Sequence, residues 1–263
     1  MSPKNRNHYK KLINYFDNSH VAEAFRTLKT NIQFSSIHKD IKTLVITSSL
    51  PSEGKSFTAC NLALTMARSG INVLLLDGDL RKPTLHNYFD LSSMRGLTNL
   101  LIEENKEYHD MSCKIENNLT VMPSGPIPPN PTELLQTKRL RELMMQLKEH
   151  FDVVIIDSPP VLAVADPSIL SVIADATLLI VEHGKCSRDS VVKAKEQLQM
   201  VKADIIGVVF NNVPPNGEVY QYSYYYGTES REKVKKTIIN RWLNWLRRKK
   251  IVEKNKIGEP YKK

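Results

Sequence analysis

Five continuous runs of Val, Ile and Leu recur along the chain, and helical patterns alternate with them. We predict strands at 43–49, 72–79, 152–160, 176–184 and 205–213. We predict helices at 18–36, 55–69, 95–104, 131–149 and 187–201. Strands that are apolar without alternation are typical of sheets covered by helices on both faces. The pattern therefore predicts an α/β fold with a doubly wound, mostly parallel sheet.

The 263 residues are enough for one large domain with a substantial core. We expect an N-terminal segment over 1–17, the domain over 18–218, a tyrosine-rich segment over 219–228 and a basic tail over 229–263. No apolar run is long enough to cross a membrane, and the first residues lack the apolar core of a secretory signal. Cys60, Cys113 and Cys186 show no paired spacing, which favours reduced thiols in a cytoplasmic protein.

The net charge of +9 is concentrated in residues 229–263, which hold 13 Lys or Arg against 4 Asp or Glu. The rest of the chain is balanced, so no nucleic-acid surface is expected on the domain. Residues 229–250 fit a helix whose apolar stripe is formed by Val234, Ile238, Trp242, Trp245 and Leu246. Such a basic helix suits an anionic membrane surface, and packing on the domain or on a protein partner is the alternative.

The segment SSLPSEGKS, at 48–56, follows the first strand and opens a helix. Gly54 lets the backbone approach a phosphate, Lys55 supplies a positive charge, and Ser56 offers a hydroxyl to Mg²⁺. We expect the nucleotide to contact Ser52, Glu53, Gly54, Lys55, Ser56 and Phe57. Ser49 stands where the usual pattern has its first glycine, and a chance GKS before a helix is the alternative.

Three aspartates lie toward the ends of predicted strands. Asp77 and Asp79 belong to the second strand, and Asp157 belongs to the third. Ligands of open parallel sheets bind at the carboxyl ends of the strands, so these carboxylates converge on the phosphate loop. We predict that Ser56, Asp77 and Asp157 hold Mg²⁺, and that a carboxylate accepts a proton from an attacking hydroxyl. The alternative is that each Asp caps the next helix or turn.

The phosphate loop, LLLDGDLRKP at 74–83 and VVIIDSPP at 153–160 together resemble the bacterial tyrosine kinases of the CapB/CpsD type, which are related to the MinD/ParA ATPases. The resemblance covers about residues 18–228 and implies ATP and Mg²⁺ as cofactors. It implies that the catalytic residues are Lys55, Asp77, Asp79, Arg81 and Asp157, without deciding which of the two aspartates Asp77 and Asp79 is the base. Asn211 or Asn212 matches the position that binds adenine. Leu50 replaces the signature lysine of MinD-like proteins.

The family also carries an ExxRxxR motif that assembles rings, and Glu23, Arg26 and Lys29 match it here. Their spacing places the three charges on nearly one helix face. Lysine at the last position keeps the charge but loses the bidentate geometry of arginine. The alternative is a solvated helix face without an oligomeric role.

The segment YQYSYYYG, at 220–227, follows a loop signal and is expected to be flexible. It contains Tyr220, Tyr222, Tyr224, Tyr225 and Tyr226, which the resemblance identifies as autophosphorylation sites. Phosphate on several of them would repel strongly and dissociate a ring. An aromatic edge strand or an adhesive binding segment is the alternative.

The leading hypothesis is an ATP-dependent protein-tyrosine kinase that phosphorylates its own C-terminal cluster and tyrosine-containing protein substrates. The resemblance further implies a separate transmembrane activator, control of capsular or exopolysaccharide synthesis, and a cytoplasmic location at the inner face of the membrane. One alternative is a membrane-associated MinD/ParA-like ATPase, favoured by the basic Trp helix and disfavoured by Leu50. The other is a nonenzymatic nucleotide-gated scaffold.

Overall fold

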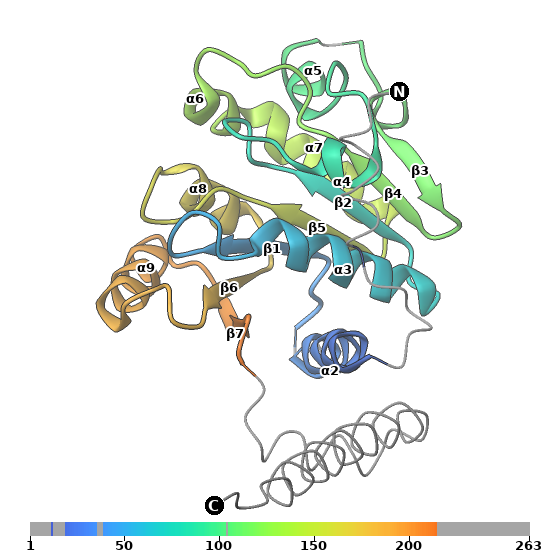
Figure 1. The fold of residues 1–263 in the computed structure, drawn as a ribbon. Helices are drawn as coiled ribbons and strands as arrows, with labels where there is room; N and C mark the ends of the chain where they lie inside the picture. Colours follow the sequence, from blue (N-terminus) through green and yellow to red (C-terminus); the bar gives the residue numbers. More distant parts are fainter. Residues whose placement is uncertain (1–11, 13–18, 36–38, 104, 215–263) are drawn as a thin grey trace, which may run out of the picture. The chain divides into compact units, whose positions relative to one another are not determined.

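The computed structural model describes residues 12, 19–35, 39–103 and 105–214. The chain divides into two compact units, residues 1–213 and 214–263, and every helix and strand named below belongs to the first. Its centre is a seven-stranded sheet in the order β3-β4-β2-β5-β1-β6-β7 (Figure 1). The strands are β1 (Thr43–Ser48), β2 (Val73–Asp77), β3 (Cys113–Glu116), β4 (Leu119–Met122), β5 (Val153–Asp157), β6 (Ala176–Glu182) and β7 (Ile205–Asn211). Only β3 is antiparallel to its neighbour, so the predicted doubly wound, mostly parallel sheet is confirmed.

Helices cover both faces of this sheet (Figure 1). They are α2 (His20–Ser35), α3 (Lys55–Arg68), α4 (Leu85–Phe89), α5 (Leu97–Ile102), α6 (Pro131–Leu135), α7 (Lys138–His150), α8 (Asp166–Ile173) and α9 (Arg188–Met200), with a 3₁₀ turn, η1 (Tyr108–Met111). The sheet has a hydrophobic core on each face, and alternate residues of β1 pack into one or the other. Leu44 packs toward α2 and α3, whereas Val45 packs toward α7 and α8. Burial on both faces explains why the central strands are apolar without alternation.

Some elements differ from the sequence predictions. The strands predicted at 72–79 and 152–160 end at Asp77 and Asp157, because the chain leaves the sheet there to form loops. The hairpin β3–β4 and the short helices α4 and α8 were not predicted, since each is too brief to show a period. The helix predicted at 131–149 is two helices, broken at Gln136 and Thr137.

The sheet brings the carboxyl ends of its central strands to one edge. Asp77 at the end of β2 lies beside Asp157 at the end of β5, and Asp157 pairs with Ile46 of β1. The loop that follows β1 therefore opens directly above both carboxylates. Within the ranges given above, no helix has the length and apolar character needed to cross a membrane.

At the opposite edge, Asp175 ties together the amino ends of β1 and β6. Its carboxylate accepts hydrogen bonds from the amide and hydroxyl of Thr43, at 2.9 and 2.8 Å, and from Lys148 Nζ at 2.8 Å. Burial alone would raise the pKa of Asp175, but the hydrogen bonds from Lys148 and Thr43 lower it below its ordinary value. The ionised carboxylate is therefore the form that stabilises the fold.

We expect Asp175→Asn to destabilise the protein by about 1–3 kcal/mol at neutral pH, because a charge-assisted network loses its acceptor. A lowered pKa in the folded state gives stability that is present above the unfolded value near 3.8 and disappears as pH falls through the folded value. Denaturant unfolding of both proteins between pH 3 and 7 checks this. A difference that stays constant down to pH 3 would show that the charge of Asp175 is not involved.

Candidate functional site

The loop between β1 and α3 has the backbone of an anion cradle. Gly54 precedes the first helical residue with φ 89°, and Ser52 also has a positive φ, of 61°. A Cβ on Gly54 would lie 2.0 Å from Asn211 Nδ2, so no other residue fits without displacing the Asn211 side chain. Successive amides at this helix start point toward an anion, and the helix dipole adds to the attraction.

Glu53 supports the loop from within. Its side chain is fully buried, and it accepts hydrogen bonds from the amides of Leu50, at 2.6 Å, and Glu182, at 3.2 Å. The Glu53 carbonyl accepts a hydrogen bond from Asn211 Nδ2 at 3.0 Å, while Asn212 Nδ2 donates to Glu182 Oε1 at 3.1 Å. These bonds fasten the loop to the ends of β6 and β7. Direct contact of Glu53, Asn211 or Asn212 with a nucleotide stays a prediction.

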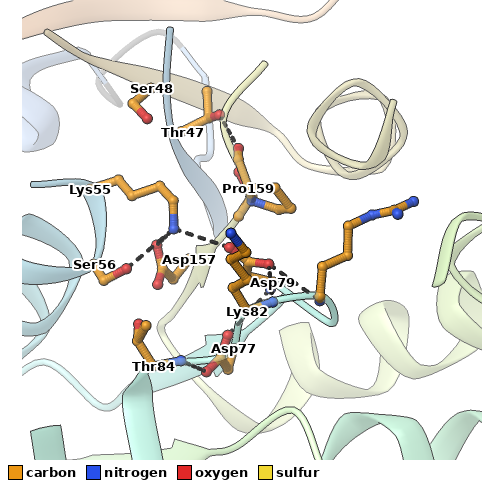
Figure 2. A network of polar contacts seen from close by, with 12 residues as sticks. Thr47, Ser48, Lys55, Ser56, Asp77, Asp79, Lys82, Thr84, Asp157 and Pro159 are labelled. Carbon is orange, nitrogen blue, oxygen red and sulfur yellow. Dashed lines mark hydrogen bonds and ion pairs between the residues drawn. The ribbon is translucent and has the colours of Figure 1, made fainter. Parts of the chain in front are cut away.

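Lys55 lies among the strand-end carboxylates (Figure 2). Its Nζ is 3.3 Å from Asp79 Oδ2 and 3.7 Å from Asp157 Oδ1, and it donates to Ser56 Oγ at 3.3 Å. Burial alone would lower the pKa of Lys55, but the charges of the nearby carboxylates, chiefly Asp157 and Asp79, raise it. The lysine is therefore held fully charged at the base of the loop, where phosphate oxygens would lie.

The two carboxylates below it are buried but differ in their partners. Asp77 Oδ2 accepts hydrogen bonds from the amides of Thr84 and Leu85, both at 3.0 Å, at the start of α4. Asp77 therefore accepts hydrogen bonds at the start of the next helix, as the capping alternative predicted, and it also lies at the candidate site. Burial, followed by the charge of Asp157, raises the pKa of Asp77 to about 8. Burial raises the pKa of Asp157 also, against the opposing charge of Lys55.

Asp157 differs from Asp77 in the hydrogen bonding of its carboxylate. Neither of its carboxylate oxygens receives a hydrogen bond from the described part of the chain, although the residue is fully buried. The ammonium of Lys55, 3.7 Å from Oδ1, offsets part of the charge of this carboxylate, and its oxygens remain able to bind a further cation. Asp157 and the Ser56 hydroxyl together supply hard oxygen donors, as Mg²⁺ requires. Among the residues that the structure describes, no group of three or more His, Cys, Asp or Glu side chains is placed to hold a metal ion.

Asp79 and Arg81 shape the turn after β2. Asp79 Oδ1 accepts hydrogen bonds from the amides of Arg81, at 3.3 Å, and Lys82, at 2.9 Å. The guanidinium of Arg81 pairs with Asp166 at 2.7 Å. Asp166 was not predicted as a site residue, because nothing in its local sequence marks it and 85 residues separate it from Arg81.

These residues open into a cleft of about 550 Å³. Three segments line it: the phosphate loop and the start of α3 (Pro51, Ser52, Gly54, Lys55, Ser56 and Phe57), the residues after β2 (Asp79, Arg81, Lys82, Thr84 and Tyr88), and the loop after β5 (Pro159, Pro160, Ala163 and Val164). The volume lies within the range of ordinary ligand pockets. A charged lysine at the base of a helix-start loop can bind phosphates, and the carboxylates can hold a cation or accept a proton.

This fold and site define a nucleotide-binding domain of the P-loop class. The AAA domain family matches residues 41–209. The chain is 43% identical over 204 residues to the tyrosine-protein kinase YwqD of Bacillus subtilis (strain 168), covering 78% of this chain and 86% of the relative. It is therefore a member of the family of bacterial tyrosine-protein kinases, as the sequence motifs predicted. A longer relative, the putative tyrosine-protein kinase EpsB of Ralstonia solanacearum, is 38% identical over 205 residues, which cover 78% of this chain and 27% of EpsB.

Solved structures agree with this assignment. The chimerical protein CapA2B2 superposes with a TM-score of 0.72 at 38% identity, over 75% of this chain and 87% of that one. The kinase domain of the Escherichia coli tyrosine kinase ETK superposes with a TM-score of 0.70 at 30% identity, over 78% and 84%. A plasmid partition protein of Borrelia burgdorferi, with a TM-score of 0.55 at 18% identity over 69% and 85%, shares the fold alone. The kinase hypothesis is thus supported over the partition-type alternative.

The remaining predicted residues lie on α2 or beyond the described chain. Arg26 Nη1 and Glu23 Oε2 form an ion pair on the exposed side of α2, one turn before Lys29. Their role in a ring stays a prediction. The five clustered tyrosines at 220–226 and the basic tail at 229–263 lie outside the residues that the structure describes.

Proposed function

We propose that this kinase transfers the γ-phosphoryl group of ATP to its own tyrosines at 220–226. The observation that carries the proposal is Lys55, held charged between Asp79 and Asp157 at the base of the phosphate loop. That arrangement suits an anion with several charges and a cation beside it. The family supplies the reaction class, and the tyrosine cluster supplies acceptors within the same chain.

In the proposed mechanism, the amides of the phosphate loop and Lys55 bind the β- and γ-phosphates. Ser56 and Asp157 would hold Mg²⁺, with Asp77 behind them, and the ion would neutralise charge on the phosphate oxygens. Asp77 or Asp79 accepts the proton of the tyrosine hydroxyl while the phenolic oxygen bonds to phosphorus and ADP leaves. Burial raises the pKa of Asp77 to about 8, so this carboxyl group must ionise, as a cation beside it would favour, before it can accept the proton.

We further propose that the chain assembles into a ring through α2, which carries the Glu23–Arg26 pair on its exposed side. The proposed partner is a separate transmembrane activator, as the resemblance to the CapB/CpsD type implies. A place at the inner face of the membrane follows from such a partner, and the tail at 229–250 would add contact with anionic lipid. Control of capsular or exopolysaccharide synthesis is the proposed outcome.

Phosphate transfer from labelled ATP with Mg²⁺ tests the central proposal. We would compare wild type with a variant in which all five clustered tyrosines are Phe, and with Tyr108→Phe as a control. Tyr108 packs edge-to-face against Phe151 and does not line the cleft, so Tyr108→Phe removes one hydroxyl away from the candidate site. We expect label on wild type and on Tyr108→Phe. We expect at least a tenfold loss of label in the variant with all five clustered tyrosines changed to Phe.

Other outcomes would redirect the proposal. Label retained when all five clustered tyrosines are Phe would place the acceptors elsewhere in the chain. Release of free phosphate without label on protein would favour a positioning ATPase. Absence of both, even with the cytoplasmic end of an activator added, would leave the nucleotide-gated scaffold as the better hypothesis.

A further inference from the structure

Arg81 belongs to a closed set of hydrogen bonds that joins three elements of the fold. Its Nε donates to Asp166 Oδ2 at 2.7 Å, and its Nη2 donates to Asp166 Oδ1 at 3.3 Å. The same Nη2 donates to Thr132 Oγ1 at 2.8 Å, and the Thr132 hydroxyl donates to Asp166 Oδ1 at 2.7 Å. Asp166 begins α8 and is fully buried, while Thr132 lies in the first turn of α6.

These bonds connect two segments of the chain that contribute to the lining of the cleft. Arg81 belongs to the segment that carries Lys82 and Thr84. Asp166 ends the loop after β5, just beyond Ala163 and Val164. The Arg81–Asp166 pair therefore links the segment after β2 to the start of α8, beside the cleft.

The pair also fixes the turn that presents Asp79. The amides of Arg81 and Lys82 both donate to Asp79 Oδ1, so the position of the Arg81 backbone sets the direction of that carboxylate. Asp79 in turn contacts Lys55. A continuous series of charge-assisted contacts thus connects the start of α8 to the lysine at the base of the phosphate loop.

We propose that Asp166 is a positioning residue for phosphoryl transfer: it holds Arg81, and through Arg81 it fixes Asp79. The inference rests on the proposed phosphotransfer activity. It assigns Arg81 a bracing role, in contrast to direct contact with the transferred phosphate. Small displacements of groups that orient reactants reduce the rate by large factors, so the effect should appear in kcat.

Steady-state kinetics of Asp166→Asn tests this role, with Asp175→Asn as the matched control. Asp175 also accepts from a lysine ammonium and a threonine hydroxyl, but at the opposite edge of the sheet. We expect Asp166→Asn to lower kcat about 10- to 100-fold while KM for ATP stays within about threefold. Asp175→Asn should change neither constant by more than about twofold at a temperature where both variants are folded. An equal loss of kcat in the two variants, or a raised KM with unchanged kcat, would overturn the proposal.

Coupling between Arg81 and Asp166 provides a second readout. If the two act as one brace, Arg81→Met, Asp166→Asn and the double variant should lose kcat by the same factor, within about threefold. A far larger loss in Arg81→Met than in Asp166→Asn, with the two losses multiplying in the double variant, would show instead that Arg81 acts on the phosphates directly.

Amide hydrogen exchange tests the brace without relying on activity. We expect Asp166→Asn to accelerate exchange at the amides of Arg81 and Lys82 about tenfold or more, and Asp175→Asn to leave them unchanged. Unchanged exchange at these amides in Asp166→Asn would refute the brace even if the kinase activity is confirmed. Accelerated exchange in a protein that transfers no phosphate would refute the proposed function and keep the brace.

Discussion

Replacing Lys55 with Met is expected to reduce phosphate transfer by at least 10²- to 10³-fold, which corresponds to about 2.7–4 kcal/mol of transition-state stabilisation. Its ammonium lies within 4 Å of both Asp79 and Asp157, and Asp77 lies close behind. Without this ammonium, no lysine charge at the base of the loop would offset the repulsion between these carboxylates and the phosphates of ATP. Phosphate label incorporated per minute, with Mg²⁺ and saturating ATP, measures the loss.

Lys148→Met is the control for this result. It removes the same charge and also breaks an ion pair with an aspartate, at 2.8 Å, but at the amino edge of the sheet. We expect its transfer rate to remain within about twofold of wild type, because the charge removed lies far from the phosphate loop. Transfer by Lys55→Met at the wild-type rate would exclude Lys55 from the reaction and remove the main support for the proposed mechanism.

Gly54→Ala is expected to have the second large effect, on stability and nucleotide binding together. The residue has φ 89°, and an added Cβ would approach Asn211 Nδ2 to 2.0 Å. The backbone conformation alone costs roughly 1–2 kcal/mol for a residue with a Cβ. Displacing Asn211 also breaks its hydrogen bond to the Glu53 carbonyl, which adds about 1 kcal/mol. We expect a total loss near 2–3 kcal/mol and no measurable ATP binding, since the loop amides must turn away from the anion.

The variant Gly70→Ala separates the cost of the backbone conformation from the cost of displacing Asn211. It has φ 96°, but an added Cβ there would meet nothing within 4 Å. Gly70→Ala should therefore lose only the conformational part, about 1–2 kcal/mol, and bind ATP normally. Thermal unfolding and titration calorimetry of the two variants give the comparison. Equal destabilisation would mean that Asn211 moves away without cost, and ATP binding by Gly54→Ala would show that the loop tolerates a Cβ.

The chemistry of the site was predictable because its signals are local. The run GKS after an apolar strand predicts the phosphate loop, and the structure places Lys55 and Ser56 at its end. The strand-end positions of Asp77 and Asp157 predicted their convergence, which the sheet register gives directly. The ligand assignments themselves remain proposals, since the sequence defines donor atoms but not what they bind.

The supports of the site were not predictable, because they join residues that no local pattern connects. Asp166 reaches Arg81 across 85 residues, and Asn211 reaches Glu53 across 158. Glu53 was assigned to the nucleotide because of its place in the motif, yet its carboxylate is buried against the amides of Leu50 and Glu182. Residue type alone does not show which side chains turn inward from a loop.

The sequence by itself determined the fold class, the phosphate loop and the acidic strand ends, because period, composition and turn chemistry act over a few residues. Only the tertiary structure decided which carboxylate is hydrogen-bonded and which pairs with Lys55 without a hydrogen bond. Asp77 receives the amides at the start of α4, a helix too short to predict, whereas Asp157 receives none. The difference arises from burial and from the order of strands in the sheet, which depend on contacts among distant segments and not on the residues beside each Asp.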